Sequence, residues 1–405
     1  MKKKIFKRMS LALSVILAIS LLSGCSSGSS SANSSSVAAS GSSSTSSAST
    51  TTQTVHRSVV SLAETSEPNT YFPYAASSTS ADDVFDFIYD RLVYTDSKGE
   101  FTPRLASSWE SNSDGTVITF HLNKDVKWQD GVAFTAQDMV FAAQVATNSA
   151  TTVTRRSYFS SLVGTDDTGV CDNVDELGVK AVDDYTLEYH FKKGVAVSTF
   201  LYIDAQRYYP MPYHLLKDVA YADMATNSYW QKPVGTGAFK FESAISGESI
   251  TLSANSSYFL GAPNVDKVVI KIMTSTSIAS ALMSGDLDMS LVSIPEGDVQ
   301  TLQQVSNLKT DINPSFKYTY MTINCSKDYF QDIRVRKAIN MAINRNEIVQ
   351  QGLYGFGTVA SFALNSDNKY FDSALDKDPY DPAAAKALLQ EAGWDFSREL
   401  VFISY

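Results

Sequence analysis

The chain has 405 residues, of which 44% are hydrophobic and 11% aromatic, and its formal net charge at pH 7 is −10. This length can bury a sizeable core and build more than one domain. The acidic balance excludes nucleic acid as an expected partner, because negative surface charge repels a polyanion.

Residues 1–24 have the composition of a cleaved signal peptide. Five cations, at positions 2, 3, 4, 7 and 8, precede an apolar run of 14 residues from Met9 to Leu22. A membrane-spanning helix needs about 20 residues, whereas a run of this length suits a signal sequence. The ending Leu22-Ser23-Gly24-Cys25 resembles the bacterial lipoprotein box, which implies cleavage before Cys25 and a lipid (palmitate) modification there. An ordinary secretory signal with a cysteine nearby is the alternative.

Residues 25–54 are expected to be the lipidated cysteine and a disordered tether. Positions 26–54 hold 20 serines or threonines among 29 residues and no charged residue, so this segment cannot bury a core. As flexible coil it would span about 30 Å. Removing the five leader cations lowers the net charge from −10 to −15. We expect the mature protein on the extracytoplasmic face of the cell membrane or in the periplasmic space, held by its lipid.

The first half of the remaining chain mixes helix and strand patterns. Apolar spacing predicts a helix over 82–92 with Ser80 as its cap. Thr135 and Asp138 form a capping-box pattern before a helix over 139–146. Strands are expected at 59–62, 116–122, 179–182 and 185–191, the last two as a β-hairpin.

The second half continues in the same way. Helices are expected at 277–283, along the apolar stripe from Val335 to Ile343, and at 383–392 before Gly393. Strands are expected at 268–273, 286–291 and 318–323, and a last strand pattern runs from Leu400 to Ser404. Because a complete domain rarely ends inside a strand, we interpret the chain as a truncated reading frame whose C-terminal part is missing.

No catalytic or metal-binding pattern stands out. The four histidines lack metal-ligand spacing, and the sequence has no nucleophile elbow, phosphate-binding loop or CxxC pair. A lone Ser-x-x-Lys match at 306–309 has no supporting elements. We expect no enzyme activity, no metal and no cofactor. Cys171 and Cys325 are expected to be separate thiols, with a disulfide as the alternative.

Aromatic residues are abundant, with 21 Tyr, 21 Phe and 4 Trp. Such rings are common in clefts that hold extended ligands. Most of them are nevertheless expected to fill the core.

Eight collinear segments carry a family resemblance. They are PRLASSWE at 103–110, TFHL at 119–122, VKWQDG at 126–131, FTAQD at 134–138, PVGTGAF at 233–239, GDLD at 285–288, DIRVRKAI at 332–339 with AINR at 342–345, and DPAAAKALLQEAG at 381–393. Together they resemble the family-5 extracellular solute-binding proteins of bacterial ABC importers, the oligopeptide- and dipeptide-binding group. Departures are Ala238 and Phe239, where the family usually has proline and tyrosine, and Asn344 in place of aspartate.

The resemblance implies an α/β, two-lobed, periplasmic-binding-protein-like fold (type II, cluster C) with an extra inserted α+β domain. Lobe I would contain 55–90 and 186–270, the inserted domain II would contain 91–185, and an incomplete lobe III would span 271–405. The missing C-terminal part would complete lobes III and I, so the chain as written would leave sheet edges unpaired.

The resemblance also implies a function. A lipid-anchored monomer would capture short peptides, close on them and deliver them to ABC permease subunits, with sheet edges pairing to the ligand backbone. By position, a strip after Pro73 would lie along the ligand, and Tyr158 would add a ring from the inserted domain. Packing is the alternative for each of these residues. The strip residues are Tyr74, Ala76, Ser77, Ser78 and Thr79.

Ligand identity stays open at this point. In the family, the aspartate that receives a peptide's amino terminus lies beyond residue 405, and members also carry nickel complexes, opines and oligosaccharides. Peptides are preferred because they are the most frequent cargo. A binding protein for a non-peptide solute, a peptide-sensing receptor lipoprotein and an anchored hydrolase are the alternatives.

Overall fold

The computed structural model describes residues 57–96, 100–205, 207–312, 319–360, 362, 371–375 and 380–403. The signal peptide, Cys25 and the tether lie outside the described residues. Every helix and strand named below belongs to the unit formed by residues 54–405. Among the described helices, none has the length and apolar character needed to cross a membrane.

A five-stranded sheet has the order β11-β1-β10-β9-β8. Strand β1 runs parallel to β10 and β11, whereas β8, β9 and β10 form antiparallel pairs. The β1–β10 ladder joins distant parts of the chain, with Leu62 opposite Ile270. The strands are β1 (Arg57–Glu64), β8 (Phe239–Ile245), β9 (Ser249–Ala254), β10 (Val265–Ile272) and β11 (Met289–Ser290).

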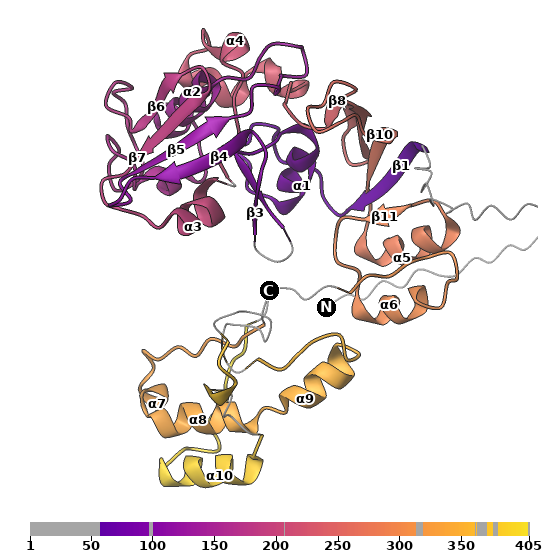
Figure 1. Cartoon of the computed structure of the whole chain (residues 1–405). Helices are drawn as coiled ribbons and strands as arrows, with labels where there is room; N and C mark the ends of the chain where they lie inside the picture. Colours follow the sequence, from indigo (N-terminus) through magenta and orange to yellow (C-terminus); the bar gives the residue numbers. More distant parts are fainter. Residues whose placement is uncertain are drawn as a thin grey trace, which may run out of the picture. The chain divides into compact units, whose positions relative to one another are not determined.

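A four-stranded antiparallel sheet has the order β4-β5-β7-β6, and helix α2 packs against it (Figure 1). The expected domain boundary between residues 185 and 186 would separate β6 from β7, but these strands pair as a hairpin, so β7 belongs with this sheet. The strands are β4 (Ala106–Ser111), β5 (Val117–Leu122), β6 (Val179–Asp183) and β7 (Thr186–His190), beside a two-stranded ribbon of β2 (Val93–Thr95) and β3 (Phe101–Pro103).

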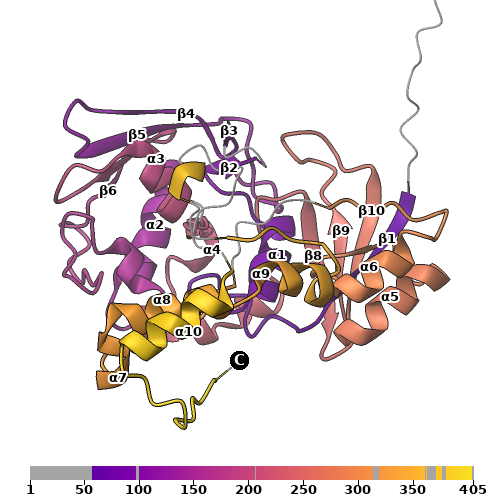
Figure 2. The ribbon, with the colours of Figure 1, turned by 90° about the horizontal axis from the view of Figure 1, so that it is seen from below.

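The α-helices are α1 (Thr79–Ile88), α2 (Ala136–Thr147), α3 (Val197–Phe200), α4 (Tyr213–Leu216), α5 (Ser275–Ser284), α6 (Glu296–Leu302), α7 (Asp328–Gln331), α8 (Ile333–Ala342), α9 (Arg345–Glu347) and α10 (Pro382–Glu391). The 3-10 and π turns are η1 (Arg156–Phe159), η2 (Leu201–Ala205), η3 (Tyr221–Thr226), η4 (Ser228–Gln231), η5 (Ile348–Gly352) and η6 (Ser373–Leu375). Helices α8 and α10 lie side by side (Figure 2), and the Arg334 guanidinium donates to the Glu391 carbonyl at 3.0 Å.

Helix starts follow their capping residues. The Asp138 carboxylate accepts the Thr135 N–H at 2.9 Å and completes the predicted capping box of α2. The predicted cap of α1 is wrong: Ser78 has an extended backbone and accepts the Ala81 N–H at 3.3 Å, while Ser80 already lies inside the helix. Helix α1 therefore begins at Thr79 and ends at Ile88 rather than at residue 92.

Three predicted strands are shorter or absent. Of 286–291, only Met289 and Ser290 form strand β11. The flanking residues still bond to β1, since the Asp288 N–H donates to the Ser61 carbonyl at 2.9 Å and the Leu291 N–H donates to the Ala63 carbonyl at 3.0 Å. Residues 319–323 and 400–403, the described parts of two further predictions, carry no strand. Alternating apolar residues predict that a segment has one buried face. A strand also requires a neighbouring strand with which it can form backbone hydrogen bonds.

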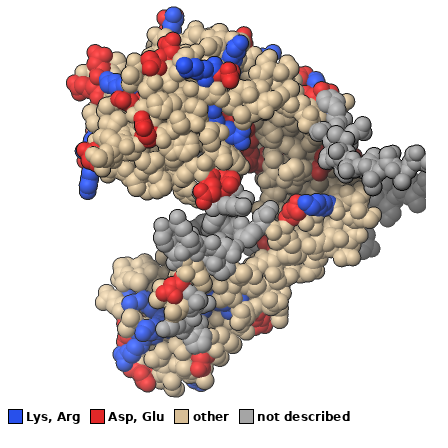
Figure 3. Space-filling view, in the orientation of Figure 1, with Lys and Arg blue, Asp and Glu red and all other residues tan. Residues whose placement is uncertain are grey.

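Aromatic side chains dominate the main core, as expected. The largest fully buried side chains include Trp128, Tyr189, Tyr208 and Phe200. On the face drawn in Figure 3, acidic and basic side chains are interspersed among neutral ones. The negative net charge is therefore spread over that face rather than gathered in one patch.

Gln129 connects three segments that are far apart in sequence. Its Nε2 donates to the Phe239 carbonyl at 2.7 Å and to the Ile88 carbonyl at 3.2 Å, and its Oε1 accepts the Gly235 N–H at 2.9 Å. The motifs at 126–131 and 233–239 thus meet at the end of α1. These hydrogen bonds give the two motifs an architectural role.

Candidate functional site

An open hollow of about 450 Å³ is formed by the loop before α1, by η1 and by the segment around η2. Aromatic rings and arginines dominate its walls. The lining residues are Pro73, Tyr74, Asp82, Arg91, Arg155, Tyr158, Phe159, Tyr202, Arg207, Tyr208 and Tyr209. A wall with apolar faces and a few polar groups is the usual lining of a small-ligand site.

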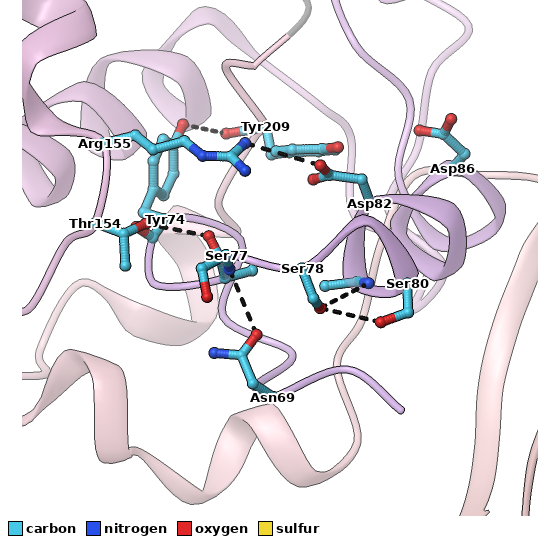
Figure 4. A network of polar contacts seen from close by, with 12 residues as sticks. Asn69, Tyr74, Ser77, Ser78, Ser80, Asp82, Asp86, Thr154, Arg155 and Tyr209 are labelled. Carbon is cyan, nitrogen blue, oxygen red and sulfur yellow. Dashed lines mark hydrogen bonds and ion pairs between the residues drawn. The ribbon is translucent and has the colours of Figure 1, made fainter. Parts of the chain in front are cut away.

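The loop before α1 is held by the segment that precedes η1. The Thr154 N–H donates to the Tyr74 carbonyl at 3.0 Å, and its hydroxyl donates to the Ala76 carbonyl at 3.1 Å. The Tyr74 hydroxyl donates to the Tyr209 carbonyl at 2.7 Å. Figure 4 shows these bonds converging on one side of α1. Hydrogen bonds therefore hold both the backbone of the loop and the side chain of Tyr74.

The six predicted ligand residues fall into two groups. Tyr74 and Tyr158 both line the hollow, so the structure brings these two together. The other four are not among the lining residues. Ala76 is buried, Ser77 and Thr79 are exposed, and Ser78 caps α1. Whether these six contact a ligand stays a prediction.

Tyr158 is positioned by its neighbours. Its carbonyl accepts the Tyr208 hydroxyl at 2.9 Å, and Tyr208 stacks on Phe159 with ring centroids 4.4 Å apart. The Arg207 guanidinium lies 4.5 Å from the centre of the Tyr158 ring, within the range of a cation–π contact. The Tyr158 backbone is thus held by the Phe159–Tyr208 stack, while the Tyr158 ring carries the Arg207 guanidinium.

Arg91 forms the base of the hollow. It is paired with Asp86 and donates to the Tyr209 hydroxyl at 2.8 Å. Burial raises the pKa of Tyr209 and that of Tyr74 well above the ordinary value. Both phenols therefore stay neutral at physiological pH; the Tyr74 hydroxyl donates to the Tyr209 carbonyl, and the Tyr209 hydroxyl accepts from Arg91.

Arg155 and Asp82 form a looser pair near the opening. Their nearest nitrogen and oxygen lie 3.7 Å apart, and the side chains are 38% and 39% exposed. An exposed ion pair of this kind contributes little free energy. Both charges can therefore change partners at small cost.

Comparison with known proteins assigns this chain to a family. The family model of bacterial extracellular solute-binding proteins, family 5 (middle region), matches residues 100–404. The chain belongs to this family.

Relatives agree with this assignment. The oligopeptide-binding protein AppA of Bacillus subtilis is 30% identical over 332 residues, which cover 81% of this chain and 58% of AppA. The solved structure of AppA with a nonapeptide matches with a TM-score of 0.68 at 27% identity, covering 84% of this chain and 65% of that one. The chain thus spans less than two thirds of AppA's length.

Two further solved structures share the fold. CtaP from Listeria monocytogenes, an ABC transporter substrate-binding protein, matches with a TM-score of 0.74 at 25% identity, covering 85% of this chain and 67% of CtaP. NikZ from Campylobacter jejuni, solved with Ni(L-His), matches with a TM-score of 0.65 at 25% identity, covering 82% of this chain and 63% of NikZ. The expected fold class, mixed α/β and two-lobed like the periplasmic binding proteins, is confirmed.

Sequence reasoning missed the charged residues of this hollow. Nothing in local spacing brings Asp82, Arg155 and Arg207 together, because they come from three separate segments. A usable signal was present in the runs Arg155-Arg156-Ser157-Tyr158 and Arg207-Tyr208-Tyr209, where arginine lies within a few positions of tyrosine. Such runs are typical of sites that combine stacking with charge.

A pair of carboxyl groups lies where β1 and α1 meet. Glu64 is only 3% exposed; its Oε1 accepts the Thr65 N–H at 2.7 Å, and its Oε2 has no hydrogen-bond partner among the described residues. Burial, reinforced by the hydrogen bond and charge of Glu64, raises the pKa of Asp83 to about 7. Asp83 is therefore partly protonated near neutral pH.

Replacing Asp83 should change how stability depends on pH. The pKa of this carboxyl rises from 3.8 in an unfolded chain to about 7 in the folded one. The folded state therefore binds more protons across that window, and stability falls as pH rises through it. Asp83→Asn should flatten this fall and raise the free energy of unfolding at pH 7.5, on the order of 1 kcal/mol after allowance for partial exposure.

Urea unfolding of both proteins from pH 4.5 to 8 measures this effect. Asp166→Asn is the matched control: hydrogen bonds from Thr168 and Val170 lower the pKa of Asp166, so its contribution to stability is lost as pH falls. Parallel curves for Asp83→Asn and the unmodified protein would contradict the raised pKa of Asp83.

Proposed function

We propose that this protein is the substrate-binding component of a bacterial ABC importer, that its cargo is short peptides, and that it binds without catalysis. The likeness to AppA, in sequence and in structure, is the observation that supports this proposal most directly. AppA is described as an oligopeptide-binding protein, and its structure contains a nonapeptide. The hollow lined by Tyr74 and Tyr158 offers the stacking and hydrogen-bonding groups that a peptide can use.

The predicted strip along the ligand is kept in the proposal for its backbone. Among the described residues, neither the Ser77 carbonyl nor the Ser78 N–H has a hydrogen-bond partner, and the Ser77 and Thr79 side chains are exposed. Backbone groups of this kind are what an extended peptide pairs with. Tyr74 and Ala76, which are held by Tyr209 and Thr154, would fix the position of the strip.

Location and partners follow from the same proposal. Cys25 would carry the lipid that holds a monomer at the extracytoplasmic face of the membrane, and the Ser/Thr tether would allow it to reach the permease subunits. Deletion of the gene separates import from sensing: loss of growth on peptides supports import, whereas loss of a peptide response alone supports a receptor.

Mass spectrometry of the full-length protein, purified from membranes, tests the proposal. A heterogeneous set of short peptides should co-purify, and the mature amino terminus should be a diacylglycerol-modified Cys25. A single non-peptide species, such as a metal complex of the kind that NikZ holds, would contradict the peptide cargo. A screen of peptide and ester substrates should show no turnover.

Removing the Tyr158 ring should weaken peptide binding. Stacking on a ring contributes about 1 kcal/mol, so Tyr158→Ala should raise the Kd of a co-purified peptide, resynthesised and titrated by calorimetry, about fivefold. Tyr94→Ala is the matched control, because Tyr94 carries the guanidinium of Arg104 at 5.0 Å but does not line the hollow. Equal affinities for Tyr158→Ala and the unmodified protein would remove Tyr158 from the site.

A further inference from the structure

The hollow has the opposite charge to the rest of the molecule. Its lining contains three arginines, Arg91, Arg155 and Arg207, and one acid, Asp82, in a chain whose net charge is −10. Positive charge in a concave site attracts anionic groups more strongly than the same charge on a flat surface. This feature concerns which ligand the site takes and therefore depends on the proposed function.

Two of the three arginines have fixed roles in the walls. Arg91 is engaged by Asp86 and by the Tyr209 hydroxyl, so its contribution is to position Tyr209. The guanidinium of Arg207 packs face-on against the Tyr158 ring. This contact holds the positive charge of Arg207 beside the opening of the hollow.

Arg155 is the arginine that can exchange its partner. It lies 3.7 Å from Asp82 in a pair that is exposed on both sides, and breaking such a pair costs little. Figure 4 shows its guanidinium directed from the Thr154 segment toward Asp82, across the same face as the Tyr74 ring. A planar guanidinium can bind a carboxylate through two parallel hydrogen bonds.

We propose that the hollow selects ligands that carry a carboxylate, which displaces Asp82 from Arg155 and is further attracted by Arg207. The carboxylate comes either from an aspartate or glutamate side chain or from the free carboxyl terminus of a peptide. Asp82 then acts as an internal competitor whose charge sets how strongly acidic ligands are preferred.

A pooled binding experiment tests this selectivity. The full-length protein is incubated with an equimolar library of synthetic pentapeptides, half with free and half with amidated carboxyl termini, and the retained peptides are quantified by mass spectrometry. We expect about tenfold enrichment of one carboxylate source over its amide counterpart. Enrichment of aspartate and glutamate over asparagine and glutamine identifies the side chain, and enrichment of free over amidated peptides identifies the terminus.

Two variants should move this preference in opposite directions. Arg155→Gln should reduce the enrichment to about twofold or less, and Asp82→Asn should increase it, because the competitor is removed. Arg104→Gln, which removes an arginine stacked on Tyr94 outside the hollow, should leave it unchanged. Thermal unfolding of each variant checks that it is folded, and Asp82→Asn supplies the test if Arg155→Gln is not.

Two results of these experiments would contradict the proposals. Retained peptides that show no preference for either carboxylate source, or a preference that neither variant changes, would overturn the carboxylate proposal while leaving peptide capture in place. Retention of no peptide at all by the unmodified protein would overturn both.

Discussion

Gly235→Ala should destabilise the protein by about 3 kcal/mol. A Cβ atom at this position would lie 1.9 Å from the Ile88 carbonyl oxygen and 2.7 Å from its carbon, so the end of α1 must move. The Gly235 carbonyl also accepts the Gln129 N–H, and the Gly235 N–H donates to Gln129 Oε1, each at 2.9 Å. Both hydrogen bonds would be strained by that movement. Because the clash is with backbone, no side-chain rotation can relieve it.

Gly247→Ala is the matched control for this substitution. Gly247 has a φ of +70°, but nothing lies within 4 Å of its missing Cβ, so the cost is the conformational penalty alone, about 1 kcal/mol. Urea unfolding of the two variants compares the values. Equal losses would mean that the contact between 233–239 and α1 does not constrain the fold.

Asp138→Ala should cost a similar amount for a different reason. The Asp138 side chain is only 3% exposed and accepts three hydrogen bonds, from Trp128 Nε1 at 3.2 Å, from the Thr135 N–H at 2.9 Å and from the Tyr213 N–H at 3.0 Å. Alanine would leave these donors without an acceptor, at a cost of about 3 kcal/mol. Thermal or urea unfolding measures the loss.

Asp183→Ala removes a comparable number of hydrogen bonds at an exposed site. Its carboxylate accepts from the Tyr185 N–H at 2.7 Å and from the Thr186 hydroxyl at 3.0 Å in the β6–β7 turn. Water can replace that carboxylate, so we expect a clearly smaller loss than for Asp138→Ala. If the two variants unfold alike, burial of Asp138 does not determine its importance.

The sites of Asp138 and Asp183 are examples of local structure that could be predicted from the sequence. Capping residues and apolar periodicity act over a few positions, so the α2 capping box and the β6–β7 hairpin were predictable. The contact of Gln129 with Gly235 spans more than 100 positions, and the meeting of Asp82, Arg155 and Arg207 spans a similar distance. Local patterns do not encode such contacts.

The predicted ligand strip also contains features that could not be predicted from the sequence. The family resemblance implied that Tyr74 and Tyr158 both contribute to the ligand site, and the structure has both in one hollow. The resemblance did not reveal that Ser78 is used as a helix cap or that Ala76 is buried. Those outcomes depend on where α1 begins and on what Thr154 contacts.

The pairing of β1 with β10 also has a consequence for the order of folding. Strand β1 is made first, but Leu62 finds Ile270 only about 200 residues later, which at ordinary rates of synthesis is about 10 to 40 s. The four-stranded sheet is complete by His190 and can form during that interval. Ladders between distant segments close slowly because of the chain entropy lost, so the five-stranded sheet is expected to assemble last, around a strand that left the ribosome first.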